Sequence, residues 1–163
     1  MPAPLVTKPV LTAVAAACAL ALPALGHSRP VTISTTLANY GGNGAYLAVY
    51  LTDAKGAYAR TLWVAGGKAK YYKHLRDWAR LSASDPKRLD GVTGASVGAG
   101  RTLDVTADLA DALLDAGYEI RIDAAAEDMR ESPSEVRVPL TKNGSGKANP
   151  GRQYIRSVTY QLQ

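Results

Sequence analysis

Short segments in which apolar and polar residues alternate recur along most of this chain, and turn-forming residues separate them. In the clearest segment, 118–127, the side chains of Tyr118, Ile120 and Ile122 alternate with those of Glu119, Arg121 and Asp123. Further segments lie at 31–37, 45–53, 61–66, 101–109, 135–140 and 154–162. A period of two residues is typical of a β-strand with one buried face. The sequence therefore predicts about seven short strands in an antiparallel β-sandwich, in preference to a parallel α/β sheet.

Two connections in this pattern are specific enough to predict. The turn formers from Asp53 to Gly56 join two strand segments and predict a hairpin. At 68–82 the period changes to that of an amphipathic helix, in which Tyr71, Leu75 and Trp78 share the face that packs on the sandwich. The basic residues Lys70, Lys73, Arg76 and Arg80 fall on another face, and Asp77 is expected to neutralise part of Lys73.

The first 26 residues have the layout of a secretory signal peptide. Lys8 precedes an apolar run at 10–25, and the small residue Gly26 follows it, so we expect cleavage after Gly26. Residues 27–163 then form a single β-sandwich domain that is periplasmic or secreted and contacts a membrane only through a partner. A lipid anchor on Cys18 is the minor alternative.

Composition excludes several kinds of site from the exported domain. Cys18 is the only cysteine, so residues 27–163 have no disulfide, zinc thiolate or cysteine nucleophile. The chain has 19 Lys plus Arg against 14 Asp plus Glu, a mild and dispersed excess that does not indicate binding to nucleic acid.

The two histidines suggest one possible metal site. Cleavage after Gly26 makes His27 the first residue, and its amine and ring nitrogen, with His74 as a third nitrogen ligand, suit copper. This arrangement resembles the histidine brace of certain exported β-sandwich proteins. The alternative interpretation is that both histidines are ordinary polar surface residues.

The glycine-rich loop LDGVTGASVGAG, residues 89–100, contains the most specific motif in the chain. Its residues Asp90, Thr93, Gly94, Ala95 and Ser96 resemble the pattern D-x-x-[ST]-G-A-[ST], which exported flavin transferases recognise. The resemblance implies that Ser96 accepts FMN as a phosphoester, that Thr93, Gly94 and Ala95 are recognition residues, and that Asp90 orients the loop. Trp63 or Trp78 would cover the flavin ring, and Lys73 or Arg76 would offset the phosphate charge. The alternative is a glycine-rich turn without a cofactor.

A broader resemblance extends over most of the exported part. The chain is similar to the predicted periplasmic proteins known as domain of unknown function 2271. The matching residues are Arg60, Thr61, Leu62, Leu75, Arg76, Trp78, Thr93, Gly94, Ala95, Ser96, Gly117, Tyr118 and Glu127. The resemblance implies an immunoglobulin-like sandwich that works with a PepSY-type membrane redox protein. The chain departs from many relatives after the motif, where it lacks their Arg-Pro and tryptophan.

These observations favour a carrier or binding module over an enzyme, because no acid, base and nucleophile converge in the sequence. Without a redox-active cysteine, an electron carrier of this kind needs a cofactor such as FMN. The other functional hypotheses are copper binding by His27 and His74 and a ligand-free immunoglobulin-like assembly module.

Overall fold

The computed structural model describes residues 26–163. The predicted signal peptide, apart from Gly26, lies outside the described residues. Within them, no helix is long and apolar enough to cross a bilayer.

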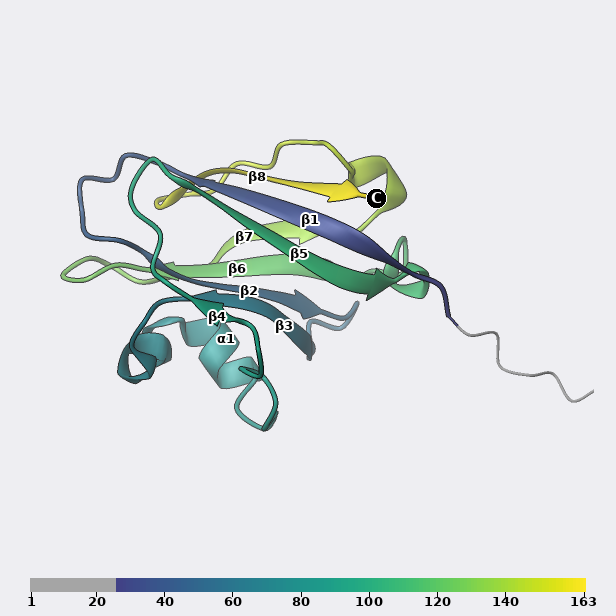
Figure 1. Cartoon of the computed structure of the whole chain (residues 1–163), viewed down its shortest axis with the longest axis horizontal. Helices are drawn as coiled ribbons and strands as arrows, with labels where there is room; N and C mark the ends of the chain where they lie inside the picture. The colour runs from purple at the N-terminus through teal and green to yellow at the C-terminus, as the bar shows by residue number, and fades with distance from the viewer. Residues whose placement is uncertain (1–25) are drawn as a thin grey trace, which may run out of the picture.

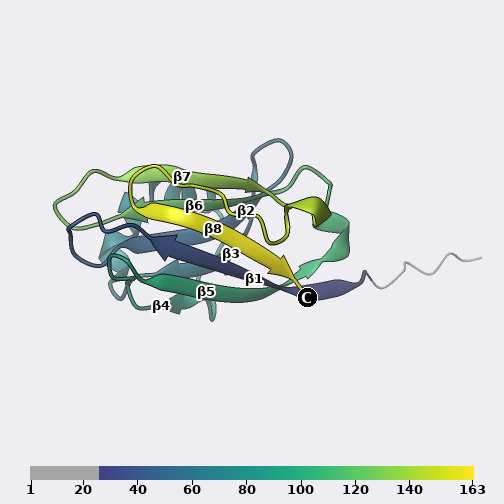
Figure 2. The same ribbon diagram turned by 90° about the horizontal axis from the view of Figure 1, so that it is seen from above.

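Two sheets face each other across one apolar core (Figures 1 and 2). The smaller sheet has the order β5-β1-β8, and the larger sheet has the order β4-β3-β2-β6-β7. The strands are β1 (Ser28–Leu37), β2 (Tyr46–Thr52), β3 (Tyr58–Ala65), β4 (Thr93–Gly94), β5 (Thr102–Ala110), β6 (Glu119–Ala125), β7 (Ser132–Pro139) and β8 (Ile155–Leu162). All neighbouring strands are antiparallel except β3 and β4. The predicted antiparallel β-sandwich is confirmed.

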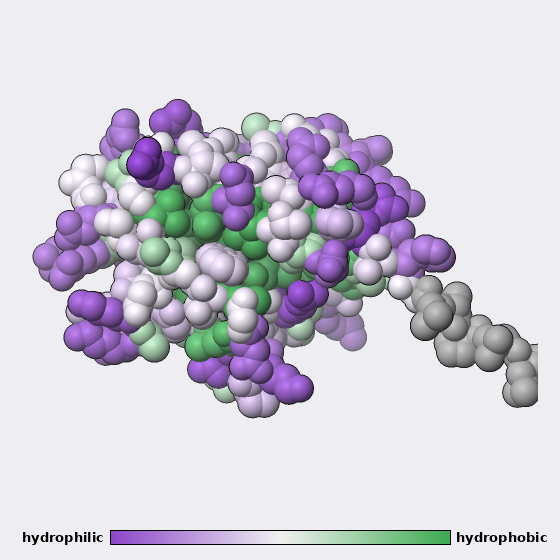
Figure 3. All heavy atoms as spheres, in the orientation of Figure 1, coloured by the Kyte–Doolittle hydropathy of each residue, from purple (hydrophilic) through white to green (hydrophobic). Residues whose placement is uncertain are grey.

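The alternation of the sequence builds the core directly. Ile33 in β1, Leu47 in β2 and Ile122 in β6 point between the sheets and are fully buried. The predicted hairpin is also confirmed, because the N–H of Ala57 and the N–H of Lys55 both bind the Asp53 carboxylate at the turn between β2 and β3. Figure 3 shows apolar side chains along the open side of the sandwich, between the edge strands of the two sheets.

The predicted helix is shorter and is interrupted. A 3₁₀ helix, η1 (Ala69–His74), and an α-helix, α1 (Arg76–Leu81), meet at Leu75, whose backbone (φ −83°, ψ 74°) leaves the helical region. Leu75 and Trp78 pack on the outer face of the larger sheet as expected. Tyr71 was expected on the same buried face, but its position on the 3₁₀ turn leaves it 37% exposed.

Two further details differ from the expected arrangement. Asp77 binds Arg80 and the Ser134 hydroxyl, and these contacts replace the predicted contact with Lys73. The loop that carries the glycine-rich motif contains strand β4, whose two residues have no strand-like pattern of their own. Two short 3₁₀ turns, η2 (Asp111–Leu113) and η3 (Lys142–Gly144), complete the helical elements.

Candidate functional site

The glycine-rich motif crosses the edge of the larger sheet and is fixed at both ends. The N–H of Val64 donates to Val92 O at 2.8 Å, and the N–H of Gly66 donates to Gly94 O at 2.7 Å. Beyond the motif, Val97 and Ala45 exchange two backbone hydrogen bonds of 2.9 and 2.7 Å. Ala95 and Ser96 span the gap between these two attachments, so their positions are set without backbone pairing of their own.

The residue types of the motif have clear structural positions. Thr93, Ala95 and Ser96 are exposed, so the two hydroxyls and the methyl group between them face solvent. A Cβ at Gly94 would lie 2.6 Å from the Trp63 ring, which explains why this position has no side chain. Asp90 is also exposed, in the preceding turn, where its N–H donates to Lys87 O at 3.0 Å.

Ser96 lies on the wall of a cavity of about 710 Å³. The cavity is bounded by the start of β2, by η1, by the Ser96 segment and by the connection between β6 and β7. Its wall includes the side chains of Ser96, Tyr46, Lys68, Tyr71, His74 and Glu131. A volume of this size is in the range of pockets that hold cofactors and other small molecules.

The absence of side chains at two glycines shapes this cavity. A Cβ at Gly44 would lie 2.9 Å from Ser96 Oγ, so a larger residue there would crowd the hydroxyl. A Cβ at Gly66 would lie within 2.5 Å of ring carbons of Tyr46, so this glycine lets the ring rest against the backbone. Both glycines therefore keep the space between Ser96 and the aromatic wall in its observed shape.

His74 and Glu131 belong to the polar part of the wall, and Arg76 contacts Glu131 from outside the cavity. His74 Nδ1 lies 2.6 Å from Glu131 Oε1, and Arg76 contacts the other carboxylate oxygen. The hydrogen bond with His74, and then that with Arg76, hold the pKa of Glu131 below its ordinary value. Since Glu131 occupies Nδ1, the other ring nitrogen of His74 is the one left for a ligand.

Tyrosines form the aromatic part of the wall. The Tyr46 and Tyr71 rings meet edge to face with their centroids 5.9 Å apart. Tyr72 lies behind Tyr46 at 6.2 Å, and its hydroxyl donates to Gly66 O. Burial raises the pKa of Tyr72. The tyrosines thus form a connected aromatic group with Tyr71 at its exposed end.

Comparison with family models shows which family this chain belongs to. The family model described as predicted periplasmic protein (DUF2271) matches residues 28–157, which include the whole cavity wall and every strand except most of β8. The chain belongs to this family. The family's description confirms the periplasmic or secreted localisation predicted from the sequence. Searches among curated proteins and among solved structures give no match.

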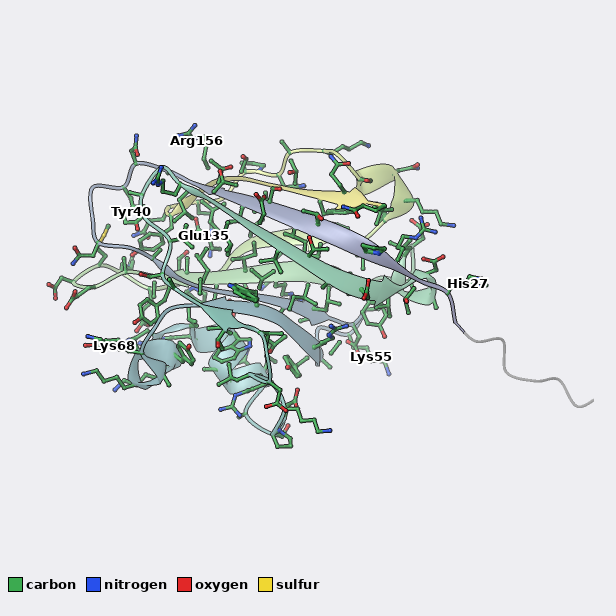
Figure 4. The ribbon with its side chains drawn as sticks, viewed as in Figure 1. His27, Tyr40, Lys55, Lys68, Glu135 and Arg156 are labelled. Atoms are coloured by element: carbon green, nitrogen blue, oxygen red, sulfur yellow. The ribbon has the colours of Figure 1, made fainter. Side chains whose placement is uncertain are left out.

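The structure of this DUF2271 domain does not bring the two histidines together. His27 lies where β1 begins. Figure 4 places Lys68 at the opposite end of the sandwich, and Lys68 directly precedes η1, the short helix that ends at His74. Across residues 26–163, no group of three or more His, Cys, Asp or Glu side chains is arranged to hold a metal ion. The copper site remains a prediction, and the geometry of the described residues does not favour it.

The predicted surroundings of Ser96 need correction. Trp78 is 1% exposed and donates its ring N–H to Thr61, while Trp63 packs beneath Gly94, so neither tryptophan lines the cavity. Arg76 binds Glu131, and Lys73 borders a second, shallower hollow. Sequence reasoning missed Tyr46, Lys68, Tyr71 and Glu131 as neighbours of the motif, because they come from three other segments and share no motif.

Proposed function

We propose that this protein is a periplasmic FMN carrier, in which Ser96 holds the flavin through a phosphoester. One observation carries the proposal: Ser96, at the end of the D-x-x-T-G-A-S segment, is exposed and lies on the wall of a cavity of about 710 Å³. An exposed hydroxyl on a flat surface would give a tether only. A hydroxyl on the rim of a cavity gives a tether and a place for the attached group.

The chemistry requires an activated flavin and a second enzyme. FAD is the activated flavin, since a phosphoanhydride joins its FMN half to AMP. In the proposed step that bond breaks, a bond forms between Ser96 Oγ and the FMN phosphorus, and AMP leaves together with the hydroxyl proton. The chain itself supplies only the nucleophilic oxygen, while an exported flavin transferase supplies the catalytic groups.

The position of the motif suits recognition by such a transferase. β4 is the end strand of the larger sheet, and it pairs only with β3. An end strand presents free backbone groups on its open side, to which another protein can add a strand. Thr93 in β4 and Ala95 directly after it are exposed, so these residues, which we assign to recognition, are available together with the acceptor. Asp90 lies before them and is assigned to orienting the loop.

A covalent flavin would give this domain its redox chemistry. Cys18, the only cysteine, lies within the predicted signal peptide, so the exported domain has no thiol for electron transfer. The bound flavin would supply reversible electron transfer, and the sandwich would hold it near a PepSY-type membrane redox protein as the exchange partner.

Intact-mass measurement on protein from a host that makes an exported flavin transferase tests the proposal. We expect one FMN adduct on the wild-type protein, no adduct on Ser96→Ala, and a reduced yield on Thr93→Val. Ser84→Ala is the matched control, because Ser84 is an exposed serine in the same long connection, and it should be modified fully. An unmodified wild-type protein, beside an active transferase that modifies another acceptor, would reject the carrier function and favour a ligand-free assembly module.

A further inference from the structure

The ring of Tyr71 is partly exposed to solvent. It is 37% exposed, and among residues 26–163 it is the one large hydrophobic side chain that is exposed. Its ring lies on the wall of the cavity that Ser96 borders. An exposed aromatic ring on a cavity wall is a common feature of sites that bind planar ligands.

The surrounding residues hold this ring in a defined position. Tyr46 contacts it edge to face at 5.9 Å, and the Lys70 ammonium lies 4.9 Å from its centroid. Tyr46 is itself fixed, because it packs against Gly66 and its hydroxyl accepts a hydrogen bond of 3.2 Å from the Lys68 N–H. A wall fixed before binding loses little conformational entropy when a ligand arrives, which favours binding.

The polar groups on the same wall define the ligand further. Lys68, His74 and Arg130 all line the cavity, and Lys and Arg offer hydrogen-bond donors that suit carbonyl oxygens and anionic groups. Glu131 holds Nδ1 of His74, which fixes how that ring is turned. The wall thus combines an aromatic surface with donors and with the carboxylates of Glu127, Asp128 and Glu131. The ligand class that fits is a planar heterocycle with both oxygen acceptors and an N–H donor along its edge.

We propose that Tyr71 and Tyr46 form the seat of the isoalloxazine ring of the flavin on Ser96, so that the cofactor folds back into the cavity. This inference rests on the proposed function and adds to it a specific location for the ring. The residues act by contact and orientation: Tyr71 and Tyr46 cover part of the ring, and His74 and Lys68 bind its polar edge. A flavin seated in this way is shielded from bulk water, whereas a flavin on a free tether is not.

Flavin fluorescence and visible circular dichroism test the seat, because a ring stacked on tyrosine is quenched and acquires an induced signal. We compare the flavinylated wild-type protein with the Tyr71→Ala and Tyr118→Ala variants, each before and after tryptic digestion. Tyr118 is the matched control, since it precedes β6 at the end of that strand away from the cavity. We expect strong quenching in the wild-type protein and the control, several-fold brighter fluorescence in Tyr71→Ala, and equal fluorescence in all three digests.

The outcomes separate the seat from the carrier function. If mass spectrometry finds FMN on Ser96 but the intact wild-type protein is as bright as its digest, the seat is wrong and the carrier function stands. Equal quenching in the wild-type protein and Tyr71→Ala also overturns the seat. If the wild-type protein takes up no FMN, both proposals fail together. A Tyr71→Phe variant guards against misfolding, because it keeps the ring and should keep the induced dichroism.

Discussion

The outer faces of the two sheets differ, although both sheets share one core. On the β5-β1-β8 sheet the outer face is wet and regular, with hydroxyl contacts between β1 and β5 such as Thr32 to Thr106 at 2.8 Å and Thr36 to Thr102 at 3.0 Å. On the larger sheet, η1 and α1 cover the outer face and enclose a second apolar cluster around Trp78. The candidate site lies at the border of this covered face, where η1, the motif and the connection between β6 and β7 meet.

The difference shows where this fold has room for a function. A regular wet face has no enclosed space, because its side chains alternate into solvent. The covered face carries η1, α1 and long connections, and the cavity lies between η1, the motif and the connection between β6 and β7. Substitutions on one face at a time therefore test this difference between the covered face and the wet face.

The largest expected effect concerns Asp123, which is fully buried on the covered face. Its carboxylate accepts hydrogen bonds from the Trp78 N–H at 2.9 Å, the Ser134 N–H at 2.8 Å and the Tyr50 hydroxyl at 3.0 Å. Burial raises the pKa of Asp123, and these three hydrogen bonds offset the rise only in part. Asp123→Ala leaves all three donors without their acceptor, so we expect the free energy of unfolding to fall by about 3–5 kcal/mol.

Urea unfolding at neutral pH measures this cost. The matched control is Asp104→Ala on the wet face, where Asp104 is exposed and accepts one hydrogen bond from the Ser34 hydroxyl. We expect the control to change the free energy of unfolding by less than about 0.5 kcal/mol. Equal effects of the two substitutions would contradict the division between a covered face and a wet face.

The second prediction concerns Glu135, which connects the two sheets. This buried carboxylate in β7 accepts backbone N–H bonds from Arg152, Gln153, Tyr154 and Ile155, the segment that leads into β8, and a bond from the Ser132 hydroxyl. Burial alone raises the pKa of Glu135, but the bonds from Ser132 and the backbone outweigh it and hold the pKa below its ordinary value of 4.5.

A lowered pKa in the folded state gives a stabilisation that is present above the ordinary pKa and is lost as the pH falls through the folded value. We therefore expect Glu135→Gln to lower the free energy of unfolding by about 1–3 kcal/mol at pH 7. The difference from the wild-type protein should shrink steadily as the pH falls below 4.5. Thermal unfolding over this pH range checks the trend, and a difference that stays constant with pH would contradict it.

The third prediction separates the structural role of the motif glycine from its role in recognition. A Cβ at Gly94 would press on the Trp63 ring at 2.6 Å, so Gly94→Ala should lower the free energy of unfolding by about 1–3 kcal/mol. Gly67→Ala is the control, because a Cβ there meets nothing within 4 Å, and it should be nearly neutral. If Gly94→Ala keeps full stability but loses flavinylation, the glycine serves the transferase and does not serve packing on Trp63.

The strands were predictable from the sequence because burial on one face imposes a period of two residues. The period correctly placed Ile120 and Ile122 inward and Asp123 outward, but it did not show that Asp123 is buried beneath α1. The break at Leu75 was hidden for a related reason, since Leu75 and Trp78 are buried whether or not the helix continues through residue 71.

The candidate site was predictable only in part. Local residue types identified the motif around Ser96, because a bare hydroxyl between small residues is a local feature. Strand β4 could not be predicted, because its two residues are held by the edge of β3 and not by any propensity of Thr93 and Gly94. The cavity wall depends on segments far apart in the sequence, so Tyr46 and Tyr71 became candidates only when the fold placed them beside Ser96.

Tandem mass spectrometry of one tryptic peptide tests directly whether Ser96 carries FMN. Cleavage after Arg88 and Arg101 releases residues 89–101, in which Thr93 and Ser96 are the two hydroxyl-bearing side chains. From protein made together with an exported flavin transferase, we predict that fragments containing 96–101 carry the flavin mass and that fragments ending at Thr93 do not. A flavin on Thr93, or an unmodified peptide beside an active transferase, would show that Ser96 is not the FMN acceptor.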